Sequence, residues 1–510
     1  MSKYIGITIG PIFDTMNLSS SPCALWASSY IFSFISKSIC EKLVENGIEK
    51  DSIISPCFNF DYDDELKKAV SRNDGTGLFH DRIIFEKPEN FDLNTIKSIK
   101  ADVIKSVNKK FDINNEEYLK NYIMISAAEY KADNPILGST QIFDCLELSK
   151  SFVIKESNNP ILDVFTSANT DGSDDKAKTA ISRNDSIKSI VETKLKIENW
   201  QLFDDDEENT IKDLGEIACS DDSDDSDNSD KKYKNYFAVV RSDGDNMSKI
   251  ISSLSEKADF KHFSSICLKY CAAVADKVKE FGGVTIYAGG DDLLALIPCK
   301  KEKDTVFDFI KGVNGVFEEK FRTYIDKIKK SNEAKADKDK TPVPSLSFGI
   351  MICYEKYPLY EALKYSADLL FDKAKSVKNC SVINLQKHSG QSVELLIPNS
   401  AVDKIISLQN EALKETDKTL LSALHKISLF EILFNQADNN SIEHIFINTF
   451  DAASHKDNDF VHKTLPNAYE KIVLVEDRVK LTDDKKDSRA NAFSSLMRIM
   501  KFYVEKGGKK

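Results

Sequence analysis

The sequence predicts an α+β protein of several domains, and three observations support this fold class. At 510 residues, the chain has room for about three or four domains. Hydrophobic residues make up 41% of it and charged residues 30%, as in a globular protein with several cores. Between residues 236 and 385 the patterns follow the order strand-helix-strand-strand-helix-strand, which is the order of a ferredoxin-like unit.

The first 150 residues open with a strand and a buried helix. A β-branched run covers Tyr4–Ile9, Gly10 and Pro11 end it, and Ala24–Leu43 follows as a long apolar helix. The same criteria predict strands over Ile53–Phe60 and Arg82–Phe85 and helices over Asp92–Lys109 and Asn115–Tyr130. We therefore expect a first domain over residues 1–150.

Residues 151–233 are expected to form a helical linker region with a disordered acidic segment over 204–230. Thirteen acidic residues and one lysine in that segment account for the whole net charge of −12. Such a run cannot bury enough apolar surface to fold alone. Two other runs are basic: residues 327–340 hold six lysines against three acids, and residues 480–510 hold nine basic residues against four acids. Charge runs are usually solvated, but basic ones can also face a phosphate backbone, so a ribonucleoprotein subunit stays possible.

Residues 234–398 show the clearest alternation and form a predicted second domain. The predicted strands are Tyr236–Arg241, Val284–Ala288, Leu293–Ile297, Ser345–Tyr354 and Ser381–Leu385, and the predicted helices are Phe260–Phe281, Asp304–Lys329 and Leu359–Lys375. Glycines between Ala288 and Leu293 supply the positive φ angles of a β-hairpin turn. The pattern after Pro398 is almost purely helical, which predicts a C-terminal helical domain over 399–510.

Two acidic motifs lie 48 positions apart in the second domain, one after its first strand and one at the hairpin tip. If those strands are neighbours in the sheet, both motifs lie at one edge. Mg²⁺ binds carboxylates together with substrate phosphates, and two such ions can activate a hydroxyl and stabilise a departing pyrophosphate. Either motif alone is usually a turn, but their order within one unit favours a catalytic role. We predict catalytic Asp243, Asp291 and Asp292, metal ligation by these three with Gly244 and Asp245, and close nucleotide approach at Gly289 and Gly290.

These segments resemble a known family. The second domain is similar to the palm polymerase domain in the large subunit of type III CRISPR effector complexes, in the runs YFAVVRSDGDNM, IYAGGDDLLALIP, PSLSFGIMICYEKYPLYEALKYSADLLFDKAK and SVINLQKHSG. The N-terminal region resembles the first, inactive palm of Cmr-type (III-B) members, in the runs IGITIGPIFDTM, ALWASSYIFSFIS and GTGLFHDRIIF. The resemblance covers about residues 4–150 and 234–395 and implies two ferredoxin-like palms, of which the second is catalytic and similar to GGDEF-type cyclases.

The resemblance also implies an activity. Such subunits act in the cytoplasm with other Cmr-type subunits, guide RNA and target RNA, which switches on synthesis of an adenylate second messenger from ATP with two Mg²⁺ (or Mn²⁺) ions. The product is cyclic oligoadenylate when the acceptor is ATP, or AMP joined to S-adenosylmethionine in some short members. We favour S-adenosylmethionine, because the chain is short and the loop Asn17–Cys23 lacks the basic residues usual in the first palm.

Further residues are implied by the same match. The GGDEF-type cyclases have Tyr-x-Ala-Lys where this chain has Asp372–Lys375, so Lys375 would contact the triphosphate and Lys373 is a weaker candidate. The implied nucleotide-binding set is Gly289, Gly290, Asn246, Lys373 and Lys375. The C-terminal domain would lie beside small helical subunits and the guide–target duplex, facing RNA with Lys485, Lys486, Arg489 and Arg498.

Two departures from the family limit what we expect, and composition limits it further. The first palm starts at residue 4 and His80-Asp81 is an isolated pair, so we expect no HD nuclease and no cleavage of DNA. Only Cys219 lies between the palms, where many relatives have a zinc-binding set, so we expect no zinc. The ten cysteines form no CxxC pair, the N-terminus has no secretory pattern, and no apolar run reaches the ~20 residues of a membrane span. These features favour reduced thiols and a cytoplasmic protein without a membrane partner.

Two alternatives remain open. A stand-alone diguanylate-cyclase-like enzyme would need GG[DE]EF at the hairpin and a sensor domain, but Leu293 and Leu294 follow Asp292 here. A non-catalytic scaffold subunit would be free to lose its site residues, yet this chain retains Asp243, Asp245, Asp291, Asp292 and Lys375, although Ser248 stands where the family has glycine. The sequence therefore favours an enzyme within a ribonucleoprotein.

Overall fold

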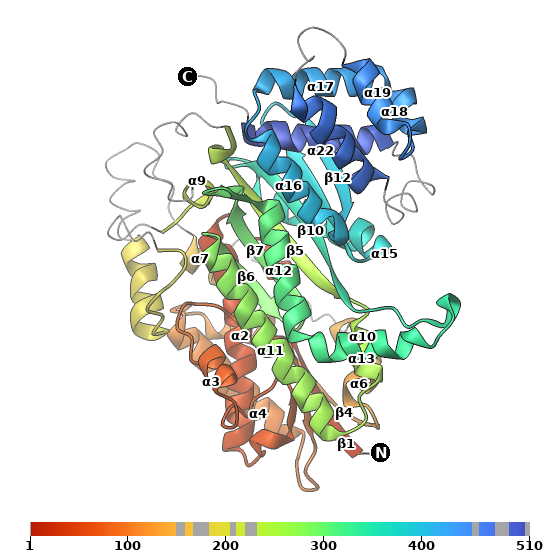
Figure 1. The fold of residues 1–510 in the computed structure, drawn as a ribbon. Helices are drawn as coiled ribbons and strands as arrows, with labels where there is room; N and C mark the ends of the chain where they lie inside the picture. The colour runs from red at the N-terminus through yellow and green to blue at the C-terminus, as the bar shows by residue number, and fades with distance from the viewer. Residues whose placement is uncertain are drawn as a thin grey trace.

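The computed structural model describes residues 2–148, 159–166, 183–203, 211–219, 232–450, 458–474 and 489–504 (Figure 1). Two large sheets form its centre, a four-stranded sheet in the order β2-β3-β1-β4 and a six-stranded sheet in the order β12-β11-β10-β5-β7-β6. In both, four strands follow the ferredoxin-like arrangement, with the first strand between the fourth and the third. The predicted α+β class with two ferredoxin-like units is confirmed.

The first sheet consists of β1 (Ser2–Gly10), β2 (Ile53–Ser55), β3 (Arg82–Glu86) and β4 (Met124–Ala132). Its helices are α1 (Ile12–Asn17), α2 (Pro22–Glu45), α3 (Asp64–Val70), α4 (Asn94–Lys110), α5 (Glu116–Tyr122) and α6 (Pro135–Leu148). Ser21 caps α2 by accepting from the Ala24 N–H, and Pro22 stands at the first turn, where its missing N–H costs nothing. Most of α2 is buried, as its apolar sequence predicts.

Two predictions for this region are wrong in extent. The helix expected over Asn115–Tyr130 ends at Tyr122, and β4 starts at Met124. β4 pairs with β1 over its whole length, and this antiparallel ladder outweighs the helical propensity of Ala127 and Ala128. The strand expected over Ile53–Phe60 ends at Ser55, because the proline that follows has no N–H for the ladder.

The second sheet contains β5 (Tyr236–Asp245), β6 (Val284–Gly289), β7 (Asp292–Pro298), β10 (Ser345–Tyr354), β11 (Cys380–Gln386) and β12 (Ser392–Pro398). β5 pairs antiparallel with β7 on one side and β10 on the other. β6 and β7 form the predicted hairpin. β12 was not expected from the sequence and extends the sheet beyond β11. A short ladder joins β8 (Lys300–Lys301) and β9 (Asp304–Thr305).

Helices cover both faces of the second sheet. One face carries α11 (Lys257–Glu280) and α12 (Val306–Lys320), and the other carries α14 (Leu359–Asp368), the π-helical segment η5 (Leu369–Ala374) and α15 (Lys375–Val377). α10 (Met247–Ser252) follows β5, and α13 (Arg322–Glu333) follows α12. The single helix expected over Asp304–Lys329 is thus divided at Phe321, whose fully buried ring packs on Phe317.

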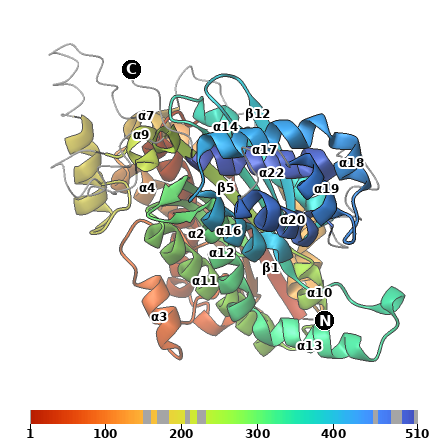
Figure 2. The ribbon, with the colours of Figure 1, turned by 45° about the horizontal axis from the view of Figure 1, so that its top comes forward.

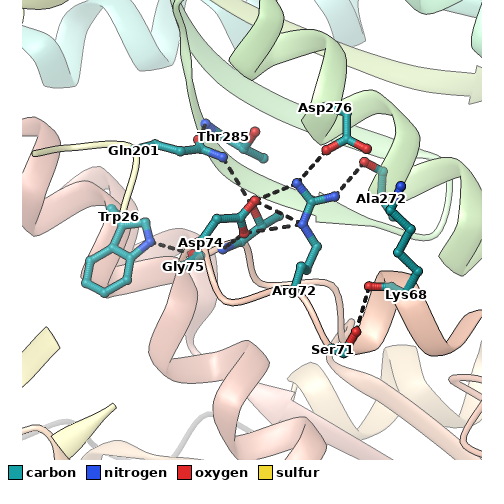
Figure 3. A network of polar contacts seen from close by, with 11 residues as sticks. Trp26, Lys68, Ser71, Arg72, Asp74, Gly75, Gln201, Ala272, Asp276 and Thr285 are labelled. Carbon is teal, nitrogen blue, oxygen red and sulfur yellow. Dashed lines mark hydrogen bonds and ion pairs between the residues drawn. The ribbon is translucent and has the colours of Figure 1, made fainter. Parts of the chain in front are cut away.

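The two units pack against each other through α11 and through the face of the larger sheet that carries α14. Side chains of α2 share one buried cluster with Phe237 and Val239 of β5, and α2 lies against β6 (Figure 1). Figure 3 shows a polar network across the same boundary. The Arg72 guanidinium donates to Asp74, to Asp276 and to the Ala272 carbonyl of α11. The side chain of Gln201 completes the link by accepting from the backbone N–H of Thr285.

Part of the expected acidic segment is ordered. Residues 211–219 contain α9 (Leu214–Ala218), which Asp213 and Glu216 cap reciprocally and which buries Ile217 and Ala218. The prediction of a continuous unfolded run over 204–230 is therefore wrong for this stretch. Its two apolar residues bury surface in the core, which the net charge of the segment does not reveal. Residues 204–210 and 220–230 lie outside the described part of the chain. The linker also contains α7 (Pro160–Phe165).

The C-terminal residues form helices over one end of the second sheet, at the top of Figure 1 and at the right of Figure 2. They are α16 (Val402–Ala412), α17 (Asp417–Leu429), α18 (Glu431–Gln436), α19 (Ile442–Thr449), α20 (Leu465–Ala468) and α22 (Arg489–Val504). α22 is buried on most of its surface, and the Tyr503 hydroxyl donates to the Cys299 carbonyl. This buried contact fixes the helices to the sheet.

We predict that Arg72→Ala lowers the free energy of unfolding by about 3 kcal/mol, because it leaves the buried Asp74 carboxylate without its cation. Lys42→Ala, which removes an exposed pair with Glu45, should cost less than about 1 kcal/mol. Denaturant titrations followed by tryptophan fluorescence compare the two. Equal midpoints for both variants would show that the network contributes nothing to the packing of the units.

Candidate active site

The two acidic motifs meet at one end of the second sheet. Asp243 lies on β5, and Asp291 precedes β7, which pairs with β5, so the expectation that these strands are neighbours is confirmed. One oxygen each from Asp243, Asp291 and Asp292 lie within 4.8 Å of one another. A Cβ on Gly244 would collide with the Asp291 carboxylate, so only glycine allows the two loops to come this close.

The charges of this cluster are only partly balanced. Burial and the repulsion of Asp243 raise the pKa of Asp291, and burial together with both other carboxylates raises the pKa of Asp292. Lys375 opposes this effect, since its Nζ lies 2.6 Å from the Asp243 Oδ2. Three carboxylates that share one ammonium group form a donor set that suits a divalent cation. The structure thus brings together four of the predicted site residues.

Asp245 lies apart from this cluster. Its carboxylate is 1% exposed, and its Oδ2 accepts from the hydroxyls of Ser345 (3.0 Å) and Ser347 (2.8 Å) and from the backbone N–H of Asn379 (2.8 Å). Its Oδ1 lies 3.2 Å from the Lys375 Nζ. Three of these donors fix the Asp245 carboxylate, which in turn holds the fourth, Lys375, in place. Asp245 is therefore not one of the three grouped carboxylates.

The other predicted nucleotide contacts divide in two. Lys373 pairs with Glu394 at 2.6 Å and does not join the cluster. Asn246, in the left-handed conformation with φ of 59°, accepts from the Lys378 Nζ at 2.8 Å. The sequence match ended at Lys375 and so missed Lys378, although a basic residue in the turn after that helix was a readable signal.

Sequence reasoning also missed a buried arginine beside the cluster. Arg241, two positions before Asp243 on β5, is 7% exposed, and its Nε donates to the Ser366 hydroxyl at 3.1 Å. Burial lowers the pKa of Arg241 to about 10. Its charge was hidden in the sequence because it stands within an apolar strand.

A cavity of about 740 Å³ opens between the hairpin and the first unit. Asp291, Asp292 and Tyr287 line its second-unit side. The first unit contributes Asp14, His80, Asp81, Arg82 and Glu147. Arg82 supplies the one cationic side chain among the lining residues, and its guanidinium donates twice to Glu147, at 3.0 and 2.9 Å. Among the charged residues of the first-unit wall, acidic side chains therefore outnumber basic ones.

The His80-Asp81 pair lies on this wall. The His80 Nδ1 accepts from the Arg82 N–H at 3.3 Å, which assigns the ring proton to Nε2, 3.0 Å from the Ser55 hydroxyl. Burial lowers the pKa of His80 to about 4, so the ring is neutral, and burial raises the pKa of Asp81 to about 6. The sequence had considered this pair only for a nuclease, because nothing local to it reveals that it faces the hairpin.

The remaining predicted residues are distributed more widely. Gly290, with φ of 69°, forms the hairpin tip, and its carbonyl accepts from the Cys271 thiol. Arg489 donates to the Ala437 carbonyl at 3.1 Å, and Arg498 is exposed on α22. Lys485 and Lys486 lie outside the described residues.

Comparisons with known proteins match both units. A family model described as "Cas10/Cmr2, second palm domain" matches residues 236–382, and one described as "CRISPR-associated protein Cmr2, N-terminal" matches residues 4–115. A curated relative, the CRISPR system Cmr subunit Cmr2 of Pyrococcus furiosus, is 30% identical over 182 residues. That alignment spans 30% of this chain and only 19% of the relative.

Solved structures share the fold at low sequence identity. The apo type III-B Cmr-beta structure matches with a TM-score of 0.53 and 11% identity, over 98% of this chain and 81% of that one. A Csm1–Csm4 cassette in complex with pppApA matches with a TM-score of 0.55 and 12% identity, over 99% of this chain and 69% of that one.

We predict that Asp292→Asn raises the melting temperature of the metal-free protein at pH 8, by about 2–4 °C, because it removes one of three like charges whose oxygens lie within 4.8 Å of one another. The folded protein holds this proton more tightly than the unfolded chain, so its stability falls as the pH rises from about 4. The gap between variant and wild type should therefore shrink on acidification to pH 4. Thermal scans in chelator measure it.

Asp245→Ala is the matched control and should lower the melting temperature, because it leaves four donors without the carboxylate that accepts their hydrogen bonds. Equal destabilisation by both substitutions would contradict the division into a repelling cluster and a saturated support.

Proposed function

Because the chain belongs to the Cas10/Cmr2 family of CRISPR-associated proteins, we propose that it is the nucleotidyltransferase subunit of a type III-B antiviral complex. It uses ATP to make an adenylate second messenger when the complex holds target RNA. The observation that carries this proposal is the convergence of Asp243, Asp291 and Asp292 within 4.8 Å beside Lys375. Two ferredoxin-like units, one with this cluster and one with the opposing wall, suit a reaction between two nucleotides.

The cluster fits divalent cations. Its three carboxylates repel one another and offer hard oxygen donors at the mouth of a cavity. Two Mg²⁺ or Mn²⁺ ions held by Asp243, Asp291 and Asp292 would polarise the α-phosphate of ATP and neutralise the charge of the departing pyrophosphate. The ammonium groups of Lys375, which donates to the Gly244 carbonyl, and of Lys378, which donates to Asn246, are our candidates for binding the remaining phosphates.

The transfer itself balances simply. A ribose hydroxyl of the acceptor attacks the α-phosphorus of ATP, a new O–P bond forms, and the bond to the β-phosphate breaks with release of pyrophosphate. The hydroxyl proton leaves to solvent. Gly290 leaves the hairpin tip open to the nucleotide, whereas Gly289 packs closely against Tyr287 and His80. Positioning by the two units provides most of the catalysis that the chain itself supplies.

The charge of the cavity distinguishes the two acceptors. The first unit presents Asp14, Asp81 and Glu147 against one arginine that Glu147 already engages. A triphosphate on the acceptor would meet mostly like charge there, whereas S-adenosylmethionine carries a sulfonium, an ammonium and a carboxylate group, with a net charge of about +1. We therefore favour AMP joined to S-adenosylmethionine over cyclic oligoadenylate.

The surface of the C-terminal helices supports a protein neighbour. Exposed apolar side chains gather on α17, α18 and α19, namely Leu421, Leu429, Ile432, Leu433 and Ile447. Such a patch is typical of a surface that a partner covers. It is consistent with assembly beside other Cmr-type subunits, guide RNA and target RNA. In the part of the chain that the structure describes, no helix is both long and apolar enough to cross a membrane.

The reconstituted complex, given target RNA, Mg²⁺ and ATP, should yield the adduct of AMP and S-adenosylmethionine only when S-adenosylmethionine is present. Mass spectrometry identifies the product. The Asp291→Asn, Asp292→Asn double variant should assemble normally and make at least 100-fold less product, because the metal ligands are lost. Wild-type yield from this variant would exclude the second palm as the catalytic site, and oligoadenylate as the sole product would reverse the choice of acceptor.

The acidic wall predicts a pH dependence. Asp81 attracts a cationic acceptor only when ionised, and its pKa is raised to about 6. The KM for S-adenosylmethionine should therefore rise as the pH falls below 6, by up to roughly tenfold per pH unit. Asp81→Asn should raise this KM at pH 8 and flatten its pH profile. The exposed control Asp102→Asn should keep the wild-type profile, and an unchanged profile in Asp81→Asn would contradict this role.

A further inference from the structure

A second hollow lies outside the site described above. A groove of about 500 Å³ runs between α10 and α13. Three lysines line it, Lys249, Lys327 and Lys340, together with hydroxyl groups that include those of Ser252 and Thr341. None of its lining residues is acidic. Ammonium and hydroxyl groups gathered without a carboxylate form a donor set for phosphate oxygens.

Two of these lysines are free to bind. Lys249 and Lys327 are exposed, and neither ammonium group has a partner among the residues that the structure describes. The positive charge continues beyond the groove, since residues 327–340 hold six lysines against three acids. Figures 1 and 2 show α13 and the segment after it projecting from the body of the protein. This extended charge matches a strand of several phosphates better than a single nucleotide.

The groove is also built rather than formed by loose side chains. Asn332 of α13 is 9% exposed, and its Nδ2 donates to the Thr341 carbonyl at 2.7 Å. Its Oδ1 accepts from the Thr341 N–H at 2.8 Å. This two-way bond fixes the returning chain against the helix, so the wall that carries Lys340 and Thr341 is in place before a ligand arrives.

The same wall leads directly to the nucleotide site. Two residues beyond Thr341, the carbonyl of Val343 accepts from the Asn246 side chain at 3.4 Å. Ser345 and Ser347 follow on β10 and donate to Asp245. The segment 341–347 therefore lines the groove at one end and contacts Asp245, which holds Lys375, at the other.

From these observations we propose that the groove between α10 and α13 binds the phosphodiester backbone of single-stranded RNA next to the nucleotide site. Binding would depend on salt and show little preference for sequence, because lysines contact phosphates and not base edges. RNA bound there would contact the 341–347 segment. Because this segment also donates to Asp245, it links the groove to the nucleotide site.

The test compares two variants of the full chain. Lys249→Glu with Lys327→Glu reverses two groove charges, and Lys303→Glu with Lys356→Glu reverses two exposed lysines outside the groove. Fluorescence anisotropy with a labelled 12-nucleotide RNA measures the dissociation constant between 50 and 300 mM salt. We expect the groove variant to bind at least tenfold more weakly, and its slope of log K against log salt to fall by about 1.4, for two lost phosphate contacts.

Two results would overturn the proposal. One is equal RNA binding by the groove and control variants, with unchanged thermal stability in both. The other is unaltered RNA binding together with a raised dissociation constant for MgATP in the groove variant, which would assign the groove to the polyphosphate of a nucleotide. Neither readout depends on catalysis, so failure of the enzymatic proposal would leave this test intact.

Discussion

The repulsion among Asp243, Asp291 and Asp292 is the constraint on which the rest of the site depends. Two loops from neighbouring strands hold these carboxylates together although burial and like charge disfavour their ionised forms. Glycine at 244 makes the approach possible, and Lys375 offsets part of the charge. Asp245 accepts from four donors, one of which is Lys375. The hydroxyls of β10 therefore stabilise the cluster indirectly, through Asp245 and Lys375. In our proposal, cations and phosphates bound at this site would balance the remaining charge.

The first ferredoxin-like unit explains why this cluster lies at a cavity and not on an open edge. The first unit places its own acidic wall opposite the hairpin, and the Arg72 network with the buried face of α2 keeps the two units in register. The chemistry that we propose joins a nucleotide bound at the three carboxylates to an acceptor bound against Asp81. In this proposal charge selects the acceptor, because a wall that repels a triphosphate favours a sulfonium nucleoside.

Much of this arrangement could be predicted from the sequence, where the signal was local. The strands around both acidic motifs and the hairpin were predicted because alternation and glycine turns mark them within a few residues, and Lys375 was implied by the family resemblance. Long-range contacts were not predictable. β4 is a strand because it pairs with β1. Lys373 pairs with Glu394, whereas Lys378 donates to Asn246. His80 and Asp81 face a hairpin some 210 positions away in the sequence. In each case a partner remote in sequence decides the role.

The most direct test of the central claim is a structure of the complex with Mn²⁺ and a non-hydrolysable ATP analogue, in which anomalous scattering locates the metal. We predict Mn²⁺ bound by Asp243, Asp291 and Asp292, with the phosphates of the analogue between these carboxylates and Lys375 and its adenosine at the cavity shared with the first unit. Mn²⁺ absent from the cluster while the analogue binds elsewhere would contradict a metal-dependent nucleotidyl transfer at this site.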